Sequence, residues 1–116
     1  MLVDKPPGVT SHDVVDMVRR SLRTRKVGHA GTLDPMATGL LILGVGRATR
    51  LLRYLGDLSK SYAATGRLGE ETDTLDADGQ IVRSASVDVS RAEIEGACAA
   101  LVGDSLQTPP AYSAVK

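Results

Sequence analysis

Segment 28–39, with the sequence GHAGTLDPMATG, constrains the fold more than any other part of the chain. Its one acidic residue, Asp34, lies between glycines and directly before a proline. Glycine permits positive φ and the close approach of another backbone. Pro35 fixes its own φ and pushes Asp34 towards an extended or turn conformation. Two interpretations follow: an ordinary Asp-Pro turn, which the local residues alone favour, or a carboxylate held rigidly for chemistry.

The length and composition are those of one globular domain. A chain of 116 residues can bury a core of its own. No apolar run approaches the roughly 18 residues of a membrane span, and no signal peptide is visible, so we expect a cytoplasmic protein without membrane contact. The single Cys98 excludes an internal disulfide and a cysteine-based metal site, and its alanine neighbours predict a small core residue.

The net charge is zero, but the charges are unevenly distributed. Residues 1–60 carry ten Lys and Arg against five Asp and Glu, whereas residues 61–116 carry four against nine. Five basic residues occupy one short stretch: Arg19, Arg20, Arg23, Arg25 and Lys26. Such a cluster favours a polyanionic partner. The alternative is a solvated helix end, where cations complement the helix dipole.

The first half of the chain predicts both strands and helices. A strand over residues 1–4 precedes a turn, and residues 10–13 supply an N-cap and a first-turn acid for a helix over residues 11–22. Apolar residues at helical spacing support this helix. After the loop that carries Asp34, called the acid loop, we expect a buried strand over residues 40–45. A second helix is expected over residues 47–56, with its leucines on the buried side.

The second half predicts strands followed by a helix. Residues 61–68 and 80–87 have a strand-like composition, and the acidic segment 70–79 between them is predicted to form a turn. That segment lacks the closing glutamate of an EF-hand loop, which disfavours a calcium site. A capping box at residues 90–93 starts a helix that ends at Gly103. Because strands and helices do not alternate strictly, the fold class is α+β with a mixed sheet.

Four ordered stretches resemble the TruB-type tRNA pseudouridine synthases. Residues 4–15 (DKPPGVTSHDVV) are similar to the opening motif of that family, and residues 26–39 (KVGHAGTLDPMATG) to its catalytic motif. Residues between 60 and 76 resemble the next motif, and residues 109–116 (PPAYSAVK) the one after it. The resemblance runs from one end of the chain to the other, and it is to the bacterial form. It implies an incomplete pseudouridine synthase catalytic fold, in which a mixed, mainly antiparallel sheet is flanked by helices.

The resemblance implies that a specific uridine, at position 55 in the T-loop of tRNA, is isomerised to pseudouridine without a cofactor or a metal. Asp34 matches the aspartate that starts this reaction in the family, either as a nucleophile or as a base on the sugar, and the sequence leaves both roles open. Either role needs an ionised carboxylate, so we expect a cationic neighbour. The target base has to be flipped out of its RNA loop and stacked on a side chain.

Two further residues acquire roles from the same resemblance. Tyr62 matches the residue that stacks on the flipped base, although a tyrosine in a strand can equally be a core residue. His29 would lie against the displaced RNA loop, since a neutral imidazole is flat enough to stack. The alternative for His29 is a structural hydrogen-bonding group beside Gly28.

The remaining contacts implied by the resemblance involve basic residues and one tyrosine. Lys5, Lys60 and Lys116 fall in motifs that border the cleft in the family, where they contact phosphates or hold the loops. Tyr112 packs near the cleft rather than stacking on a base. The basic cluster of residues 19–26 is the expected footprint of the tRNA backbone.

The resemblance also implies that residues 1–116 are the N-terminal portion of a catalytic domain. Family members continue past the motif ending at Lys116 with later catalytic strands and a C-terminal RNA-binding domain, and a later motif carries an arginine that pairs with the aspartate. We therefore expect an exposed sheet edge and exposed apolar surface in this chain. At full length we expect a monomer that binds the T-loop and stem of tRNA, with no obligate protein partner.

Three functions remain open at this point: an active pseudouridine synthase, a non-catalytic RNA-binding fragment of one, and an interaction domain in which the acid loop is only a turn. Salt-dependent tRNA binding separates the third from the other two, because phosphate contacts release counterions. Turnover separates the first from the second.

Overall fold

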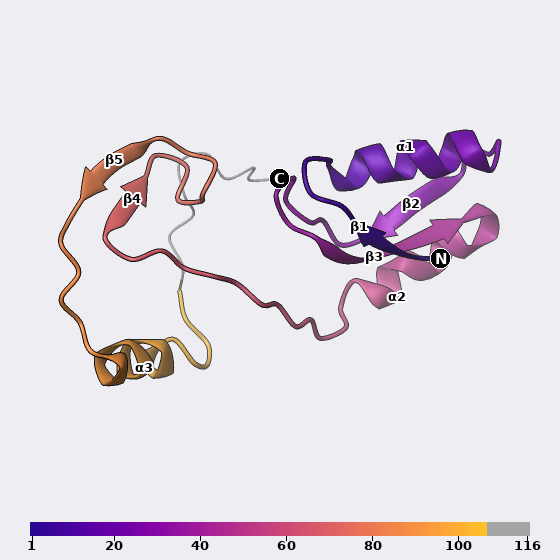
Figure 1. Ribbon diagram of the computed structural model, residues 1–116. Coiled ribbons are helices and arrows are strands. Elements are labelled where there is room, and N and C mark those ends of the chain that lie inside the picture. The colour runs from indigo at the N-terminus through magenta and orange to yellow at the C-terminus, as the bar shows by residue number, and fades with distance from the viewer. Residues whose placement is uncertain (107–116) are drawn as a thin grey trace. The chain divides into compact units, whose positions relative to one another are not determined.

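The computed structural model describes residues 1–106 (Figure 1). The chain divides into two units, Met1–Tyr62 and Ala63–Lys116. The predicted α+β class is confirmed, and every strand pair in the described part is antiparallel. No helix within residues 1–106 is long and apolar enough to cross a membrane.

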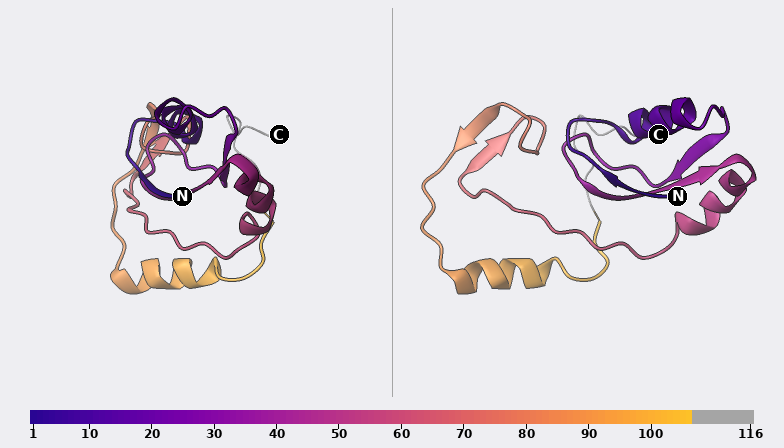
Figure 2. Two further views of the ribbon diagram at one scale, coloured as in Figure 1. Left: turned by 90° about the vertical axis from the view of Figure 1, so that its right-hand side faces the viewer. Right: turned by 45° about the vertical axis from the view of Figure 1, so that its right-hand side comes forward.

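Unit 1 is a three-stranded sheet with helices on both faces. Its elements in chain order are β1 (Leu2–Lys5), α1 (Ser11–Ser21), β2 (Val27–Ala30), β3 (Gly39–Val45), the 3₁₀ helix η1 (Gly46–Leu51) and α2 (Leu52–Leu55). The strand order is β1-β3-β2, so β3 is the central strand. α1 lies on one side of this sheet, and η1 with α2 lies on the other (Figure 1, Figure 2).

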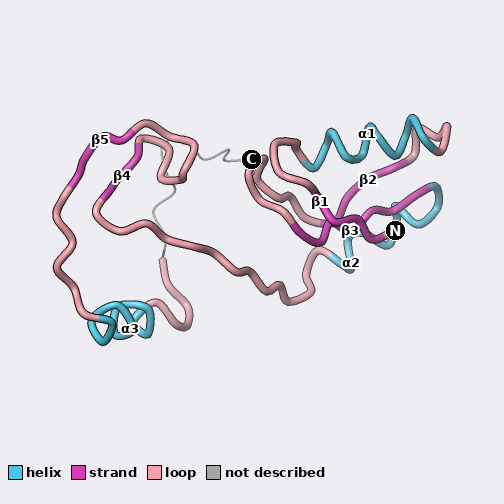
Figure 3. The backbone as a smooth tube through the Cα atoms, in the orientation of Figure 1, coloured by secondary structure: helices cyan, strands magenta, loops and turns pink. Residues whose placement is uncertain are grey.

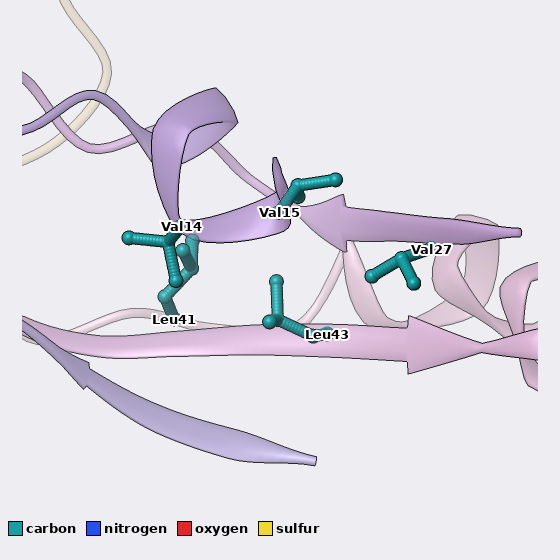
Figure 4. Close-up of a cluster of buried hydrophobic side chains, with 5 residues drawn as sticks. All are labelled: Val14, Val15, Val27, Leu41 and Leu43. Atoms are coloured by element: carbon teal, nitrogen blue, oxygen red, sulfur yellow. The ribbon is translucent and has the colours of Figure 1, made fainter. Parts of the chain in front are cut away.

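The apolar core of unit 1 lies between α1 and the sheet. The buried hydrophobic side chains within residues 1–106 are Val14 and Val15 from α1, Val27 from β2, and Leu41 and Leu43 from β3 (Figure 4). Leu41 and Leu43 are two residues apart on a strand, so both point towards the face that α1 covers. Burying one such side chain stabilises a fold by about 1.5–3 kcal/mol. The core therefore fixes α1 over the two strands that flank the acid loop.

On the opposite face of the sheet, η1 and α2 pack against two glycines. Gly28 and Gly44 are register partners on β2 and β3. A Cβ atom at Gly44 would stand 2.9 Å from Thr49 Cα and 3.0 Å from the Ala48 carbonyl oxygen, and one at Gly28 would stand 3.2 Å from Leu52 Cδ1. Glycine at these two positions therefore lets the backbone of η1 and the side chains of α2 approach the sheet closely.

α1 begins at the predicted N-cap. The Thr10 hydroxyl accepts the Asp13 N–H at 3.0 Å, and the Asp13 carboxylate accepts the Thr10 N–H at 2.8 Å. Hydrogen bonds from the Thr10 hydroxyl, and then from the Thr10 N–H, hold the pKa of Asp13 below its ordinary value. Arg19 and Arg20 lie in the last turn, where cations complement the helix dipole. Both ends of α1 are thus specified by local sequence.

One charged side chain belongs to the buried interior. Lys5, at the end of β1, has 0% exposed surface. Its ammonium group donates hydrogen bonds to the carbonyl oxygens of Val9 at 2.7 Å, Pro6 at 2.9 Å and Pro35 at 3.1 Å. Three N–H donors meet three acceptors, so the buried charge is satisfied. Lys5 thereby ties the β1–α1 connection to the acid loop.

Two parts of unit 1 differ from the sequence-based predictions. Residues 27–30, predicted as loop, form β2, because the edge of β3 offers their backbone hydrogen-bonding partners. The helix predicted over residues 47–56 begins instead as the 3₁₀ turns of η1, and Leu51, predicted as buried, is exposed. Leu52 and Leu55 are half-buried as expected. The strands predicted over the first residues and over 40–45 and the helix over 11–22 are confirmed within one or two residues.

Unit 2 contains a β-hairpin and a helix. β4 (Glu70–Thr72) pairs with β5 (Ile81–Ser84), and Glu71 forms an ion pair with Arg83 across the strands at 2.7 Å. α3 (Arg91–Ala100) follows and begins at the predicted capping box. Every residue of β5 and α3 is exposed. Unit 2 therefore presents apolar side chains such as Val82 to solvent.

Three predictions for the second half are wrong, and a fourth, the strand over 80–87, holds only in part. Residues 61–67 form neither strand nor helix (Figure 3), because within residues 1–106 no strand pairs with their backbone. Residues 70–72, predicted as part of a turn, form β4 because cross-strand pairing with β5 outweighs their acidic composition. The strand predicted over 80–87 is limited to β5. Cys98, predicted as a core residue, is exposed on α3.

We expect Gly44→Ala to destabilise unit 1 by about 1–3 kcal/mol, because the new methyl group would meet backbone atoms of η1 that cannot rotate away. Gly28→Ala is the matched control, since its methyl group would meet only the end of the Leu52 side chain. Urea unfolding followed by circular dichroism measures the free energy of both variants. An equal loss in the two would contradict the packing argument.

We expect Lys5→Met to lower the free energy of unfolding by about 1–3 kcal/mol, because it removes this donor from the carbonyl oxygens of Pro6 and Val9 and one of two donors from that of Pro35. Lys60→Met is the control: the Lys60 ammonium group also donates to two carbonyl oxygens, those of Gly56 and Leu58, but it is exposed and water can replace it. The same urea titration measures the free energy of unfolding of both variants. A Lys5→Met variant as stable as the parent chain would refute this role for Lys5.

Candidate active site

The acid loop, residues 31–38, connects β2 to β3 and places Asp34 on the surface. Gly31 has φ +93° and Gly39 has φ +113°, values that side-chain-bearing residues rarely adopt. The glycines at both ends of the loop are therefore required by its backbone path. The Ala37 N–H donates to the Asp34 carbonyl oxygen at 3.1 Å and closes a turn around Pro35.

The residues on either side of Asp34 are bonded to the β1–α1 segment. Before it, the Leu33 N–H donates to the Ser11 hydroxyl at 2.9 Å, and that hydroxyl donates to the Leu33 carbonyl oxygen at 3.2 Å. After it, the Pro35 carbonyl oxygen accepts the Gly8 N–H at 2.8 Å as well as the Lys5 ammonium group. A solvated turn needs no such supports. The carboxylate is therefore exposed on a loop whose backbone is fixed from both sides.

The structure favours one of the two roles considered for Lys5. A phosphate contact requires an accessible ammonium group, whereas Lys5 is fully buried and its three donors are already used. Lys5 holds the loops. The cationic neighbour expected for Asp34 is not found, since none of the ion pairs within residues 1–106 involves Asp34.

His29 lies on β2, two residues before the start of the glycine-flanked loop. Its Nδ1 atom is 2.6 Å from the Gly31 carbonyl oxygen. Because a carbonyl oxygen only accepts, this hydrogen bond places the ring hydrogen on Nδ1 and leaves Nε2 as the free nitrogen. The structural hydrogen bond considered for His29 is thus present. The ring is only partly buried and retains a surface for stacking.

Tyr62 and Lys60 lie in the segment after α2. Tyr62 is 72% exposed, so it is not a core residue of the described part. The ammonium group of Lys60 donates to the carbonyl oxygens of Gly56 at 2.6 Å and Leu58 at 3.0 Å, where it closes the end of α2. Its stem lies near the acid loop, since a Cβ atom at Gly31 would stand 3.9 Å from Lys60 Cε. Tyr112 and Lys116 lie outside the described residues.

The basic cluster divides into one structural residue and four exposed ones. The Arg19 guanidinium donates to the Asp16 carboxylate at 2.9 Å and to the Val27 carbonyl oxygen at 3.0 Å, so it fixes α1 to β2. The other members are exposed: Arg20, Arg23, Arg25 and Lys26. They lie at the end of β2 opposite the acid loop, so the structure does not bring them to Asp34.

Sequence reasoning missed an extension of this basic surface. The Gly46 N–H donates to the Lys26 carbonyl oxygen at 2.7 Å, which brings the start of η1 beside the cluster. Exposed arginines follow every third residue, at Arg47, Arg50 and Arg53. Arg47 and Arg50 lie on η1, where residues three apart eclipse one another, and Arg53 lies on α2, so the three-residue spacing was the available signal. The structure thus joins basic residues from two separate sequence segments.

The described residues offer no metal centre. Within residues 1–106 no group of three His, Cys, Asp or Glu side chains is placed to hold a metal ion. The acidic loop between β4 and β5 uses its carboxylates internally: Asp76 accepts the Thr74 hydroxyl at 2.6 Å, and Asp73 accepts the Gln80 N–H at 2.8 Å. These bonds shape the hairpin turn. Asp34 is therefore the candidate for carboxylate chemistry in unit 1, where basic residues outnumber acidic ones.

Comparisons with known proteins give matches to one family. The family model described as "TruB family pseudouridylate synthase (N terminal domain)" matches residues 19–116. Proteins named tRNA pseudouridine synthase B are 57% identical in Arthrobacter sp. (strain FB24), 53% in Opitutus terrae and 55% in Thermobifida fusca, each over all of this chain. The chain covers 38%, 48% and 40% of these relatives, less than half of their length.

A solved structure shows the same fold. A chain in the crystal structure of a Cbf5-Nop10-Gar1 complex aligns with 99% of this chain at a TM-score of 0.65 and 28% identity, and 30% of that chain is covered. The family predicted from the ordered motifs is confirmed by the family model and by the relatives. The chain belongs to the TruB family of pseudouridylate synthases and matches their N-terminal domain.

Proposed function

We propose that this chain forms the N-terminal portion of the catalytic domain of a tRNA pseudouridine synthase, which converts uridine 55 in the T-loop to pseudouridine. The observation that carries the proposal is the exposed Asp34 on a loop fixed from both sides, in a chain of the TruB family. The names of the relatives support tRNA as the substrate. The protein acts in the cytoplasm, as a monomer, without a cofactor or an obligate protein partner.

The reaction is an isomerisation with no net gain or loss of atoms. The bond between the sugar and N1 of the uracil breaks, the sugar is joined to C5, C5 loses its proton, and N1 gains one. Asp34 starts the sequence as a nucleophile on the sugar or as a base that removes a sugar proton. Both routes regenerate the carboxylate. A rigid loop suits both, because positioning a reacting group can contribute several orders of magnitude in rate.

The other residues of unit 1 recognise the flipped-out base and its loop. The exposed ring of Tyr62 offers a stacking platform, as flipping enzymes require. His29, with Nδ1 bonded to Gly31, lies against the displaced part of the T-loop. Lys60 lies near the acid loop at Gly31, where it holds the segment that carries Tyr62. The resemblance to the family also implies contacts near the cleft for Tyr112 and Lys116, which lie outside the described residues.

The basic surface formed by the end of α1, the α1–β2 connection, η1 and α2 binds the tRNA backbone. Its exposed members are Arg20, Arg23, Arg25, Lys26, Arg47, Arg50 and Arg53. Phosphate contacts of this kind position the RNA without reading its sequence. Since these side chains and Asp34 lie at opposite ends of β2, the substrate must extend along the sheet, as the T-stem and T-loop together can.

The first test is release of tritium from a tRNA transcript labelled at C5 of its uridines. We expect release by a chimera in which residues 1–116 are followed by the remaining length of the Arthrobacter enzyme, and a loss of at least about 1,000-fold with Asp34→Asn, because the amide cannot act as nucleophile or base. Asp57→Asn, which removes another exposed carboxylate of unit 1, is the control with unchanged release.

Residues 1–116 alone are assayed beside the chimera. If the chimera is active and residues 1–116 alone bind tRNA without turnover, residues 1–116 are a non-catalytic RNA-binding fragment. Undiminished release by Asp34→Asn, or a chimera that releases no tritium, would refute the proposed enzyme function.

Affinity for tRNA as a function of salt tests the basic surface. We expect Lys26→Ala and Arg50→Ala each to weaken binding and to reduce the slope of log K against log salt concentration by about 0.7–0.9, the value for one lost phosphate contact. Arg91→Ala is the matched control, because Arg91 is exposed on α3 and paired with Glu95 at 2.6 Å. Slopes that remain equal in all variants would exclude this surface as the phosphate contact.

A further inference from the structure

The hydroxyl of Ser11 has a function that the helix does not explain. Ser11 is the first residue of α1 and is 2% exposed. The N-terminus of α1 is already capped by Thr10 and Asp13, whose side chains bond to each other's backbone. The Ser11 hydroxyl instead faces the acid loop, where it bonds to both the N–H and the carbonyl oxygen of Leu33.

These two bonds act on the residue directly before Asp34. A single hydroxyl accepts from the Leu33 N–H at 2.9 Å and donates to the Leu33 carbonyl oxygen at 3.2 Å, so both polar groups of that backbone residue have their direction fixed. The Leu33 side chain is half-buried and packs against the apolar core of unit 1. The peptide that leads into Asp34 is therefore held by its polar and its apolar groups at once.

We propose that Ser11 is a positioning residue for Asp34, an inference that rests on the proposed function. It acts through the Leu33 backbone and touches neither substrate nor reacting atoms. Lys5 and Gly8 hold the carbonyl oxygen after Asp34, and Ser11 supplies the corresponding support before it. Without the Ser11 hydroxyl the carboxylate is still present, but its orientation is no longer fixed. The chemical step therefore slows, while the surface that binds RNA is unchanged.

The test compares two neighbouring hydroxyl deletions in the chimera. Both Ser11→Ala and Thr10→Ala remove one hydroxyl from the start of α1, but only Ser11 contacts Leu33. At a temperature where both variants are folded, we expect Ser11→Ala to lower the single-turnover rate constant roughly 10- to 100-fold, since small misplacements of a reacting group have effects of this size. The Kd of Ser11→Ala for tRNA stays within about twofold of the parent value. Thr10→Ala keeps both the rate constant and the Kd of the parent.

Hydrogen exchange gives a second measurement that does not depend on turnover. Peptides that cover residues 31–38 exchange faster in Ser11→Ala than in the parent, and at the parent rate in Thr10→Ala. If Ser11→Ala does not fold, Ser11→Cys is measured in its place with the same direction expected, because the thiol keeps the volume but is a weaker donor and acceptor.

The outcomes separate the inference from the proposed function. A parent chimera without turnover refutes the proposed function. An active parent in which the two alanine variants lose rate equally, or in which Ser11→Ala weakens tRNA binding and leaves the rate constant intact, overturns only the role of Ser11. Unchanged exchange in residues 31–38 of Ser11→Ala overturns it as well.

Discussion

The burial of the Lys5 ammonium group is the interaction on which the rest of unit 1 depends. An ionised amine removed from water loses several kcal/mol of solvation unless its protons find acceptors. In this fold the acceptors are three carbonyl oxygens, two from the β1–α1 connection and one from Pro35. The three carbonyl oxygens must be in place together, because displacement of the acid loop would leave the ammonium group without one of its acceptors. The position of the acid loop is therefore coupled to the folding of the sheet edge.

This polar arrangement compensates for a small apolar core. The buried hydrophobic side chains of the described residues come from α1, β2 and β3 and hold the helix over the sheet. Apolar contacts are non-directional, so they do not determine the angle at which a surface loop leaves its strand. Hydrogen bonds are directional, and those from Ser11, Gly8 and Lys5 converge on Leu33 and Pro35. Packing thus places the loop, and polar bonds orient it.

The features that could be predicted from the sequence are those set by residues close together in the chain. The capping boxes at Thr10 and Ser90 each need only an acid three residues later. Strands are different, because a strand exists only where another strand supplies bonds to its backbone. β2 has such a neighbour in β3, whereas residues 61–67 have none within the described part. Composition alone could not distinguish these two segments.

The same limit applies to the candidate site. The glycines and the proline around Asp34 allowed an ordinary turn as well as a fixed carboxylate, and only the resemblance to the TruB family motif selected Asp34 as the candidate. The choice between a phosphate contact and a loop support for Lys5 depended on a partner 30 residues away. Arg19 likewise could not be separated from the other basic residues until Val27 was seen to accept its hydrogen bond. Side chains of one chemical type acquire different functions through contacts that the linear sequence does not contain.

The supports of Asp34 also set an order in which a site of this kind can be built. The hydrogen bonds that hold the residues on either side of Asp34, Leu33 and Pro35, all come from residues 5–11, within unit 1. The backbone that carries the carboxylate is thus held by residues that precede it in the sequence and lie in the same unit.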